Sequence, residues 1–259
     1  MKKTSLATGL ITMAAFLLPL GAVADHHEEA AAPPPLTEVW IVVPKAGMEA
    51  EFTAAATANL KYRAEQGDSR SWQAYRVALG ENIRIVQFRA CCFDWADQDA
   101  YEEEIAEKGL TQHWNETVHQ YVDHYHHYLE RMDAANSHWP DGEGDGPYFG
   151  ATTWKVKQGA GPASDEARKK MSQFGIESGW DGNWLWLSRI GGTPETSIVS
   201  SFASFADMAP PEQTFYAKMV EAMGEEETAQ LFADFASGFS ESSYTIWKHD
   251  TAMSMPDNE

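Results

Sequence analysis

The sequence predicts an α+β protein built from two tandem repeats, and two observations support this prediction. First, three short segments recur at nearly equal offsets: residues 38–43 return as 152–157, 94–96 as 207–209, and 131–135 as 248–252. A fixed period in separated parts of a chain indicates duplication of one unit. Second, the spacing of apolar residues switches between the period of a strand and that of a helix in the same order in both halves.

The repeats lie between segments that have no apolar periodicity. Residues 1–24 have the pattern of a signal peptide, because Lys2 and Lys3 precede a short apolar run and Ala22–Ala24 offers small residues for cleavage. We therefore expect export and a periplasmic or secreted protein. The predicted divisions are a signal peptide 1–24, an acidic, proline-rich leader 25–36, repeat one 37–139, a glycine-rich linker 140–148, repeat two 149–254 and a tail 255–259.

The first repeat opens with a strand, since Val39, Ile41 and Val43 alternate with their neighbours. The stripe that predicts a following helix consists of Met48, Phe52, Ala56 and Leu60, each four residues apart. Two paired strands, 71–79 and 82–90, should come next, joined around Gly80. A helical region with Trp114, Val118 and Val122 then leads to a closing strand over 125–134.

The second repeat shows the same order of elements. A strand around 152–157 precedes a helix with the stripe Ala163, Ala167 and Met171. The paired strands are predicted at 183–190 and 197–204, and the last strand at 243–252. The helical stripe before it is Phe215, Met219, Met223, Leu231 and Phe235. This βαββαβ order is that of a ferredoxin-like unit, whose antiparallel sheet carries helices on one face. Two such units can cover their remaining faces by packing sheet to sheet as a pseudo-dimeric α/β barrel.

The chain resembles the dimeric α/β-barrel superfamily over about residues 37–254. The resemblance rests on the element order, on Pro44–Phe52 at the start of the first helix, and on Phe93–Ala96 at the start of a later one. The superfamily includes antibiotic-biosynthesis-monooxygenase and NIPSNAP-type proteins. The resemblance implies a fold whose members include cofactor-free oxygenases, haem enzymes and proteins of unknown role. It transfers no set of catalytic residues to this chain.

Period-two alternation sorts the strand residues onto two faces. The set expected beneath the helices is Val39, Ile41, Val43, Tyr75, Val77, Leu79, Leu129, Leu185, Leu187 and Ile246. The set expected between the two sheets, and therefore the candidate ligand-binding set, is Trp40, Trp72, Arg76, His126, Tyr128, Glu130, Trp154, Trp184, Trp186 and Trp247. These large rings either fill the interface or leave an apolar pocket with a few convergent polar groups, which is the usual composition of a small-molecule site.

Histidines raise the alternative of a metal or haem site. His124 and His126 share a strand face and could present two imidazoles to one ion, although no third ligand is indicated by spacing. If cleavage follows Ala24, the new terminus Asp25-His26-His27 could bind Cu(II) through its amine and His27, in the square-planar geometry that copper favours. Haem is the alternative that the resemblance implies. The first expectation is that no cofactor is tightly held.

Composition excludes several classes of function. A net charge of −20 repels phosphate backbones and anionic lipid, so nucleic-acid and membrane-surface partners are not expected. The familiar signatures of serine hydrolases, nucleotide-binding proteins and zinc proteases do not occur. The two cysteines, Cys91 and Cys92, are neighbours. Adjacent Cα atoms lie about 3.8 Å apart, less than the usual ~4.4 Å minimum of a bridge, so a disulfide between them would be strained. We expect two small buried residues at a strand end, and the alternative is a redox or intermolecular role.

The sequence thus favours an exported protein that binds a small apolar or aromatic molecule, and the enzymatic version of this hypothesis is a cofactor-free oxygenase. One alternative is a haem or metal protein that uses the histidine-rich strand. Another is a non-catalytic interaction module whose tryptophan face packs only against protein. A homo-oligomer is compatible with each of these readings.

Overall fold

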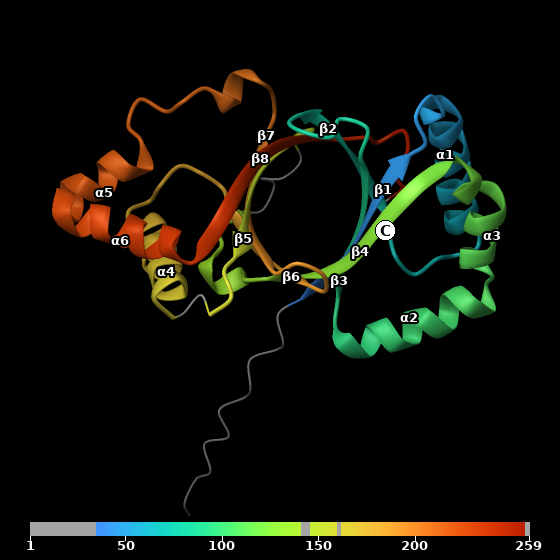
Figure 1. Ribbon diagram of the computed structural model, residues 1–259, viewed down its shortest axis with the longest axis horizontal. Coiled ribbons are helices and arrows are strands. Elements are labelled where there is room, and N and C mark those ends of the chain that lie inside the picture. The colour runs from blue at the N-terminus through green and yellow to red at the C-terminus, as the bar shows by residue number, and fades with distance from the viewer. Residues whose placement is uncertain (1–34, 141–145, 160–161, 257–259) are drawn as a thin grey trace, which may run out of the picture. The chain divides into compact units, whose positions relative to one another are not determined.

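Eight antiparallel strands close into one barrel in the computed structural model, which describes residues 35–140, 146–159 and 162–256. Figure 1 shows the strands as a ring with helices on two sides. Around the barrel the strand order is β1-β3-β2-β8-β5-β7-β6-β4, and every neighbouring pair is antiparallel. The predicted α+β class and the dimeric α/β-barrel fold are confirmed.

Strands and helices alternate along the chain in an order that occurs twice, strand–helix–strand–strand–helix–helix–strand. The strands are β1 (Leu36–Pro44), β2 (Gln73–Leu79), β3 (Val86–Phe93), β4 (Val122–Met132), β5 (Tyr148–Val156), β6 (Leu185–Ile190), β7 (Glu195–Phe202) and β8 (Phe239–His249). The α-helices are α1 (Glu49–Glu65), α2 (Trp95–Glu107), α3 (Leu110–Thr117), α4 (Pro162–Glu177), α5 (Phe215–Met223) and α6 (Glu225–Ser237). Descent of the two halves from one duplicated unit stays a prediction.

Several predicted segments lie outside the described residues. They are the signal peptide 1–24, the leader up to residue 34, linker residues 141–145 and tail residues 257–259. Their assignments stay predictions, as does export. Among the helices of the described chain, none has the length and apolar character needed to cross a membrane.

The two halves join edge to edge, which differs from the predicted packing of one sheet on another. β2 pairs with β8, where Arg76 lies opposite Lys248, and β4 pairs with β6, where Glu130 lies opposite Arg189. Each four-stranded half has two edge strands whose backbone N–H and C=O groups need partners, and this pairing supplies them at both seams. The barrel therefore has a lumen and an outer face rather than a flat sheet-to-sheet interface.

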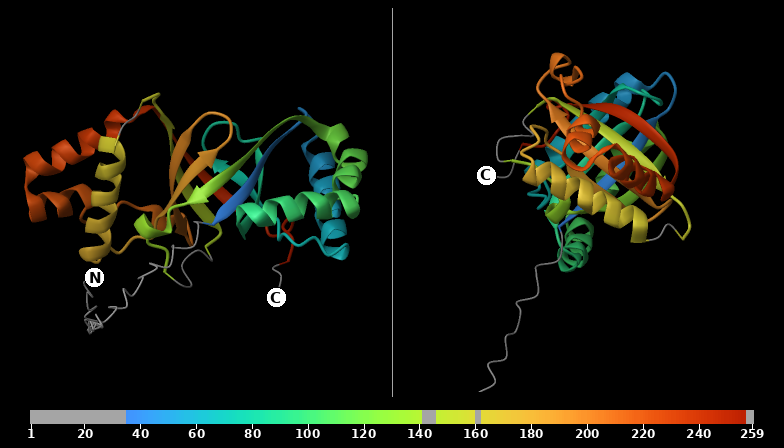
Figure 2. Two further views of the ribbon diagram at one scale, coloured as in Figure 1. Left: turned by 90° about the horizontal axis from the view of Figure 1, so that it is seen from below. Right: turned by 90° about the vertical axis from the view of Figure 1, so that its left-hand side faces the viewer.

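Helices cover the outer face of the barrel on two sides. Three of the four residues of the predicted α1 stripe are buried: Phe52, Ala56 and Leu60 pack with Val42 and Phe88 of the strands. Met48, the fourth, caps the helix and is exposed. On the other side, Met171 of α4, Met219 of α5 and Phe235 of α6 form a second core. In Figure 2 the two groups of helices lie at opposite sides of the strands.

Five of the six tryptophans predicted to share one inner space lie instead in these outer cores. Trp40 and Trp72 pack in the core beneath α1–α3. Trp154, Trp184 and Trp186 pack in the core beneath α4–α6. Trp247 alone of the six faces the lumen. The face assignment was therefore wrong for these five residues.

Arg76 also lies on the outer face. Its Nε donates to Asp250 at 2.6 Å, and its Nη2 donates to the Thr53 hydroxyl of α1 at 2.9 Å. Conversely, Val39, Ile41 and Leu187, predicted beneath helices, line the inside of the barrel.

Four of the five outer tryptophans have a hydrogen-bond partner for the indole N–H. A buried indole needs a partner for its N–H group. The outer partners are Glu38 for Trp40 at 2.9 Å, Tyr101 for Trp72 at 3.1 Å, the Asn136 carbonyl for Trp184 at 2.8 Å and Ser172 for Trp186 at 2.9 Å. Gly175 of α4 adds room, because a Cβ there would lie 2.8 Å from the Trp184 ring.

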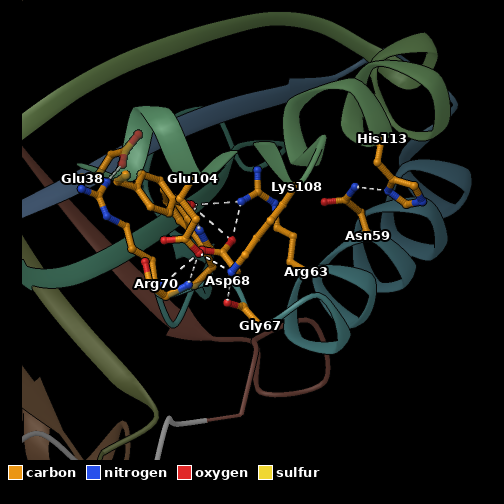
Figure 3. A network of polar contacts seen from close by, with 12 residues as sticks. Glu38, Asn59, Arg63, Gly67, Asp68, Arg70, Glu104, Lys108 and His113 are labelled. Atoms are coloured by element: carbon orange, nitrogen blue, oxygen red, sulfur yellow. Dashed lines mark hydrogen bonds and ion pairs between the residues drawn. The ribbon is translucent and has the colours of Figure 1, made fainter. Parts of the chain in front are cut away.

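A buried polar network ties the loop before β2 to α2 (Figure 3). Arg70 forms an ion pair with Glu38, and its guanidinium lies 3.8 Å from the Phe93 ring centre and 3.9 Å from that of Tyr101. Tyr101 donates to Asp68 at 3.2 Å. Burial raises the pKa of Tyr101 to about 12, although the nearby charge of Arg63 opposes this shift.

The outer location of Trp186 predicts a large loss of stability on truncation. Trp186 is 5% exposed, so Trp186→Ala should lower the free energy of unfolding by about 3–5 kcal/mol. The control is Trp95→Ala, since Trp95 is 52% exposed and should change stability by less than about 0.5 kcal/mol. Urea unfolding measures both. Equal effects of the two substitutions would contradict the packing described.

The raised pKa of Tyr101 predicts a loss of stability at high pH. The unfolded side chain ionises near pH 10 and the folded one near pH 12. The folded state is therefore fully favoured below pH ~10, and about 2–3 kcal/mol is lost as pH rises to 12. Tyr101→Phe lacks this ionisation, so its stability should fall less steeply across this interval. Urea unfolding at each pH measures both proteins. If the unaltered protein and Tyr101→Phe lost the same stability across this interval, the assignment would be refuted.

Candidate functional site in the barrel lumen

The barrel encloses a cavity of about 1160 Å³, lined by side chains from all eight strands. The lining follows from strand alternation, because every second residue of a barrel strand points inward. On β4, for example, His126, Tyr128, Glu130 and Met132 line the cavity. A volume of this size accommodates a small organic molecule.

Six charged side chains of alternating sign cross the wall from strand to strand. We call this set the charged arc; it consists of Arg89, Glu130, Arg189, Glu195, Lys155 and Glu241. Three ion pairs lie within it: Arg89–Glu130 at 2.5 Å, Arg189–Glu195 at 2.8 Å and Lys155–Glu241 at 2.6 Å. Strand register connects the pairs, since Glu130 lies opposite Arg189, and Glu195 lies opposite Lys155. Each cation of the arc therefore has a carboxylate partner.

The most deeply placed pair is Arg89–Glu130, in which the Glu130 side chain is 8% exposed. Burial, the largest single effect, lowers the pKa of Arg89, but the charge and hydrogen bond of Glu130, together with Tyr128 and Tyr75, raise it by more, so the net shift of the pKa is upward. The Arg89 guanidinium thus keeps its positive charge.

Tyr128 lies beside this arc and is held as a neutral phenol. The guanidinium carbon of Arg189 stands 3.9 Å from the centre of the Tyr128 ring. Burial raises the pKa of Tyr128, the charge of Glu130 adds to the rise, and Arg189 and Arg89 oppose it. Because an unperturbed tyrosine already ionises only near pH 10, Tyr128 stays protonated at neutral pH.

Apolar and aromatic side chains form another part of the wall. Trp247 packs against a cluster of Val39, Ile41 and Tyr128. Next to it on β5, Phe149 lies opposite Trp247 in the strand register. Phe149 also meets Tyr75 edge to face, with ring centres 5.5 Å apart. The lumen therefore offers aromatic surface as well as charge.

Small side chains on β5, β7 and β8 leave the room that the cavity occupies. They are Ala151, Thr153, Ser197, Ser243 and Thr245. Thr153 and Ser197 are joined by a hydrogen bond of 2.9 Å. These positions alternate with residues of the outer face, so their smallness directly sets the width of the lumen.

Four of the ten predicted ligand-binding residues line the cavity, namely His126, Tyr128, Glu130 and Trp247. Sequence reasoning missed Arg89, Arg189, Glu195, Lys155 and Glu241. A signal for some of them existed. Arg89 is the only charged residue of β3 and stands between Phe88 and Ala90, and such an isolated charge needs a partner inside the fold.

The predicted metal sites gain no support from the described residues, which contain no group of three or more histidine, cysteine or acidic side chains able to hold an ion. His124 and His126 do lie near each other, with ring centres 5.4 Å apart and an edge-to-face arrangement. The Nδ1 of His124 bonds to Asp123 at 2.7 Å. The predicted copper site Asp25, His26 and His27 lies outside the described residues.

The described residues also fit a haem poorly. A haem needs an axial donor over an accommodating pocket. His126 lines the cavity but is exposed, and the lumen wall carries the three ion pairs of the charged arc. The two spaces between helices and strands are filled by tryptophan and other apolar side chains.

Comparisons with known proteins support the fold. No protein-family model and no curated protein matches the sequence. Among solved structures, the chain is similar to a mutant chlorite dismutase from Candidatus Nitrospira defluvii, with a TM-score of 0.50, 10% identity, and coverage of 84% of this chain and 92% of that chain. At this identity the similarity shows the fold alone.

Two further solved structures have lower scores. One is a candidate monooxygenase from Lactobacillus acidophilus, with a TM-score of 0.49, 12% identity, and coverage of 84% and 95% of the two chains. The other is a heme-binding protein from Thermus thermophilus, with a TM-score of 0.45, 10% identity, and coverage of 85% and 93%.

The buried position of Glu130 predicts that its charge is needed for stability. Glu130→Gln leaves Arg89 without its partner, so the free energy of unfolding should fall by about 3 kcal/mol. The matched control is Glu241→Gln, because Glu241 is 65% exposed and its pair should contribute less than about 1 kcal/mol. Chemical denaturation of both variants measures the difference. A smaller loss for Glu130→Gln than for Glu241→Gln would refute the burial argument.

Proposed function

We propose that the barrel lumen binds a small molecule that has an aromatic or apolar body and is neutral or positively charged. The observation that carries the proposal is a cavity of about 1160 Å³ whose wall combines aromatic rings with charges that are already paired. A sheet-to-sheet contact filled only by protein would leave no such space. The cavity therefore favours ligand binding over a purely structural interaction module.

The aromatic character of the ligand follows from the wall beside Trp247. Phe149 and Tyr75 lie edge to face there, and Trp247 is the strand neighbour of Phe149. Aromatic rings prefer offset or edge-to-face partners at ring-centre distances of roughly 4.5–7 Å. A flat apolar molecule that enters the lumen could continue this arrangement.

The charge preference follows from the charged arc. Arg89, Arg189 and Lys155 are each engaged by a carboxylate, so an anionic ligand would have to displace one of these partners. Glu81 adds a further acidic group to the lining. The net charge of −20 also attracts cations and repels anions from the surroundings.

Catalysis requires more of the lumen than binding does. A general base must be free to accept a proton near its operating pH. The carboxylates of the charged arc are engaged by cations, and Tyr128 is held as a phenol. We propose binding as the primary role, and the cofactor-free oxygenase reaction, for which His126 and Glu81 of the lining are candidate bases, stays a prediction. A periplasmic or secreted location and a homo-oligomer also stay predictions.

The proposal predicts a dependence on ligand charge in three probes with the same ring. Benzyl alcohol and benzyltrimethylammonium should raise the unfolding temperature of the full chain in a concentration-dependent way, and benzoate should not. A ligand at one hundred times its dissociation constant stabilises by about 2.7 kcal/mol. A shift caused by benzoate alone would contradict the proposed charge preference, and no shift with any probe would contradict lumen binding.

Two phenylalanine substitutions locate the site. Ala151→Phe fills the lumen beside the small residues and should abolish the shift. Ala58→Phe, on the exposed side of α1, should leave it unchanged.

Haem is tested separately: a visible absorption band that appears on hemin titration and is lost in His126→Ala would favour the haem alternative instead.

A further inference from the structure

We propose that the Cys91–Cys92 pair is a thiol–disulfide exchange site that accepts small thiols. The two cysteines form a disulfide bond. Both are exposed, although Ala90 before them and Phe93 after them are buried. This corrects the prediction of two small buried residues. The proposal does not depend on ligand binding in the lumen.

The first argument is that this disulfide closes no chain segment. A disulfide stabilises a fold chiefly by restricting the unfolded chain, and the effect grows with the number of residues between the cysteines. Here the sequence separation is 1. The bond therefore contributes almost nothing of this kind, so a structural role does not account for it.

The second argument is the backbone around Cys92. Between β1 and β3, Leu36 pairs with Phe93 and Thr37 pairs with Cys91, so Cys92 has no opposite residue in the ladder. Such a bulge turns a side chain away from the regular alternation, and bulges are frequent beside functional sites. Cys92 is thus presented outside the strand pairing.

The third argument is access from two sides. A second cavity of about 650 Å³ lies against the end of β3, and its lining includes Cys91, Cys92, Arg70 and Tyr101. Cys91 and Ser71 line both this cavity and the lumen. A small thiol can therefore reach the disulfide from the second cavity or through the barrel. Exposed disulfides are the labile and reactive ones, whereas structural disulfides resist reduction.

Complete reduction of the disulfide consumes two thiol groups of the reagent. A thiolate attacks one of the two cysteine sulfurs, the bond between them breaks, and its electron pair goes to the other sulfur, which takes up a proton. A second thiolate then attacks the reagent sulfur of the mixed disulfide, so that the remaining cysteine leaves as a thiolate and is protonated. The products are reduced Cys91 and Cys92 and one disulfide of the reagent. The protein gains two electrons, and the reverse reaction needs an external disulfide.

The experiment uses the full chain purified without reductant. Iodoacetamide in denaturant should add no group to the untreated protein, because both sulfurs are bonded. After treatment with dithiothreitol under native conditions, mass spectrometry should find one group on each cysteine, with the far-UV circular dichroism unchanged. The rate of reduction should lie within about tenfold of that measured in urea. The Cys91→Ser/Cys92→Ser variant should add no group and unfold at the same urea concentration.

Three results would overturn the proposal. The first is free thiol in the untreated protein. The second is reduction that occurs only after unfolding, which would mean that the disulfide is not accessible in the folded chain. The third is a large fall in the urea midpoint of the double serine variant, because the bond would then be structural.

Discussion

Edge-to-edge pairing of β2 with β8 and of β4 with β6 determines which side chains meet in this protein. It turns eight strands into a closed wall, so that alternate residues of every strand are directed to one shared interior. Arg89 of β3 reaches Glu130 of β4 across the intervening strand β1, and Glu130 is brought opposite Arg189 of β6 only at a seam between the halves. Each ion pair of the arc lies within one half of the chain, and closure joins the three pairs into one continuous arc.

Closure also separates two kinds of burial. Outside the strands, helices supply hydroxyl and carbonyl groups, and buried tryptophans find partners there, such as Ser172 for Trp186. Inside the barrel, the described residues include no helix, and the inward-facing residues of all eight strands share one lumen. Charges are tolerated inside because they are paired; an isolated charge of this burial would carry a penalty of several kcal/mol. The polar lumen and the apolar outer layer are thus two consequences of one arrangement.

The sequence predicted the elements better than it predicted their faces. The α1 stripe of Phe52, Ala56 and Leu60 has helical spacing and one apolar side, so its burial follows from periodicity. Strand alternation separates Trp40 from Val39 but does not state which of them faces inward. That choice depends on strand tilt and closure, and bulky rings suit a cavity wall as well as a helix–strand layer. The prediction of which face points into the barrel was therefore wrong for β1, β2, β5 and β6.

The ion pairs between strands could not be predicted from the sequence either. Arg89 and Glu130 are 41 residues apart, and nothing local to either one indicates the other. The neighbouring cysteines differ from this pair, because the sequence alone shows that they are close together. Their adjacency is visible in the sequence, but the bulge that takes Cys92 out of the ladder depends on the register between β1 and β3. Local patterns reveal which residues are unusual, whereas their exposure and partners are set by strands far apart in the chain.

The same register leaves Cys92 outside the pairing that holds β3 in the barrel, while Cys91 stays paired with Thr37. β3 is held to β1 through Thr37–Cys91 and the pairs that follow it toward Val86, and to β2 through Arg89 and its neighbours. Cys92 takes no part in these pairings. Its sulfur can therefore change its bonding partner without removing a hydrogen bond that closes the barrel. A reactive group at this position is compatible with a rigid lumen, since exchange at Cys92 and ligand binding beside Arg89 use different parts of one strand.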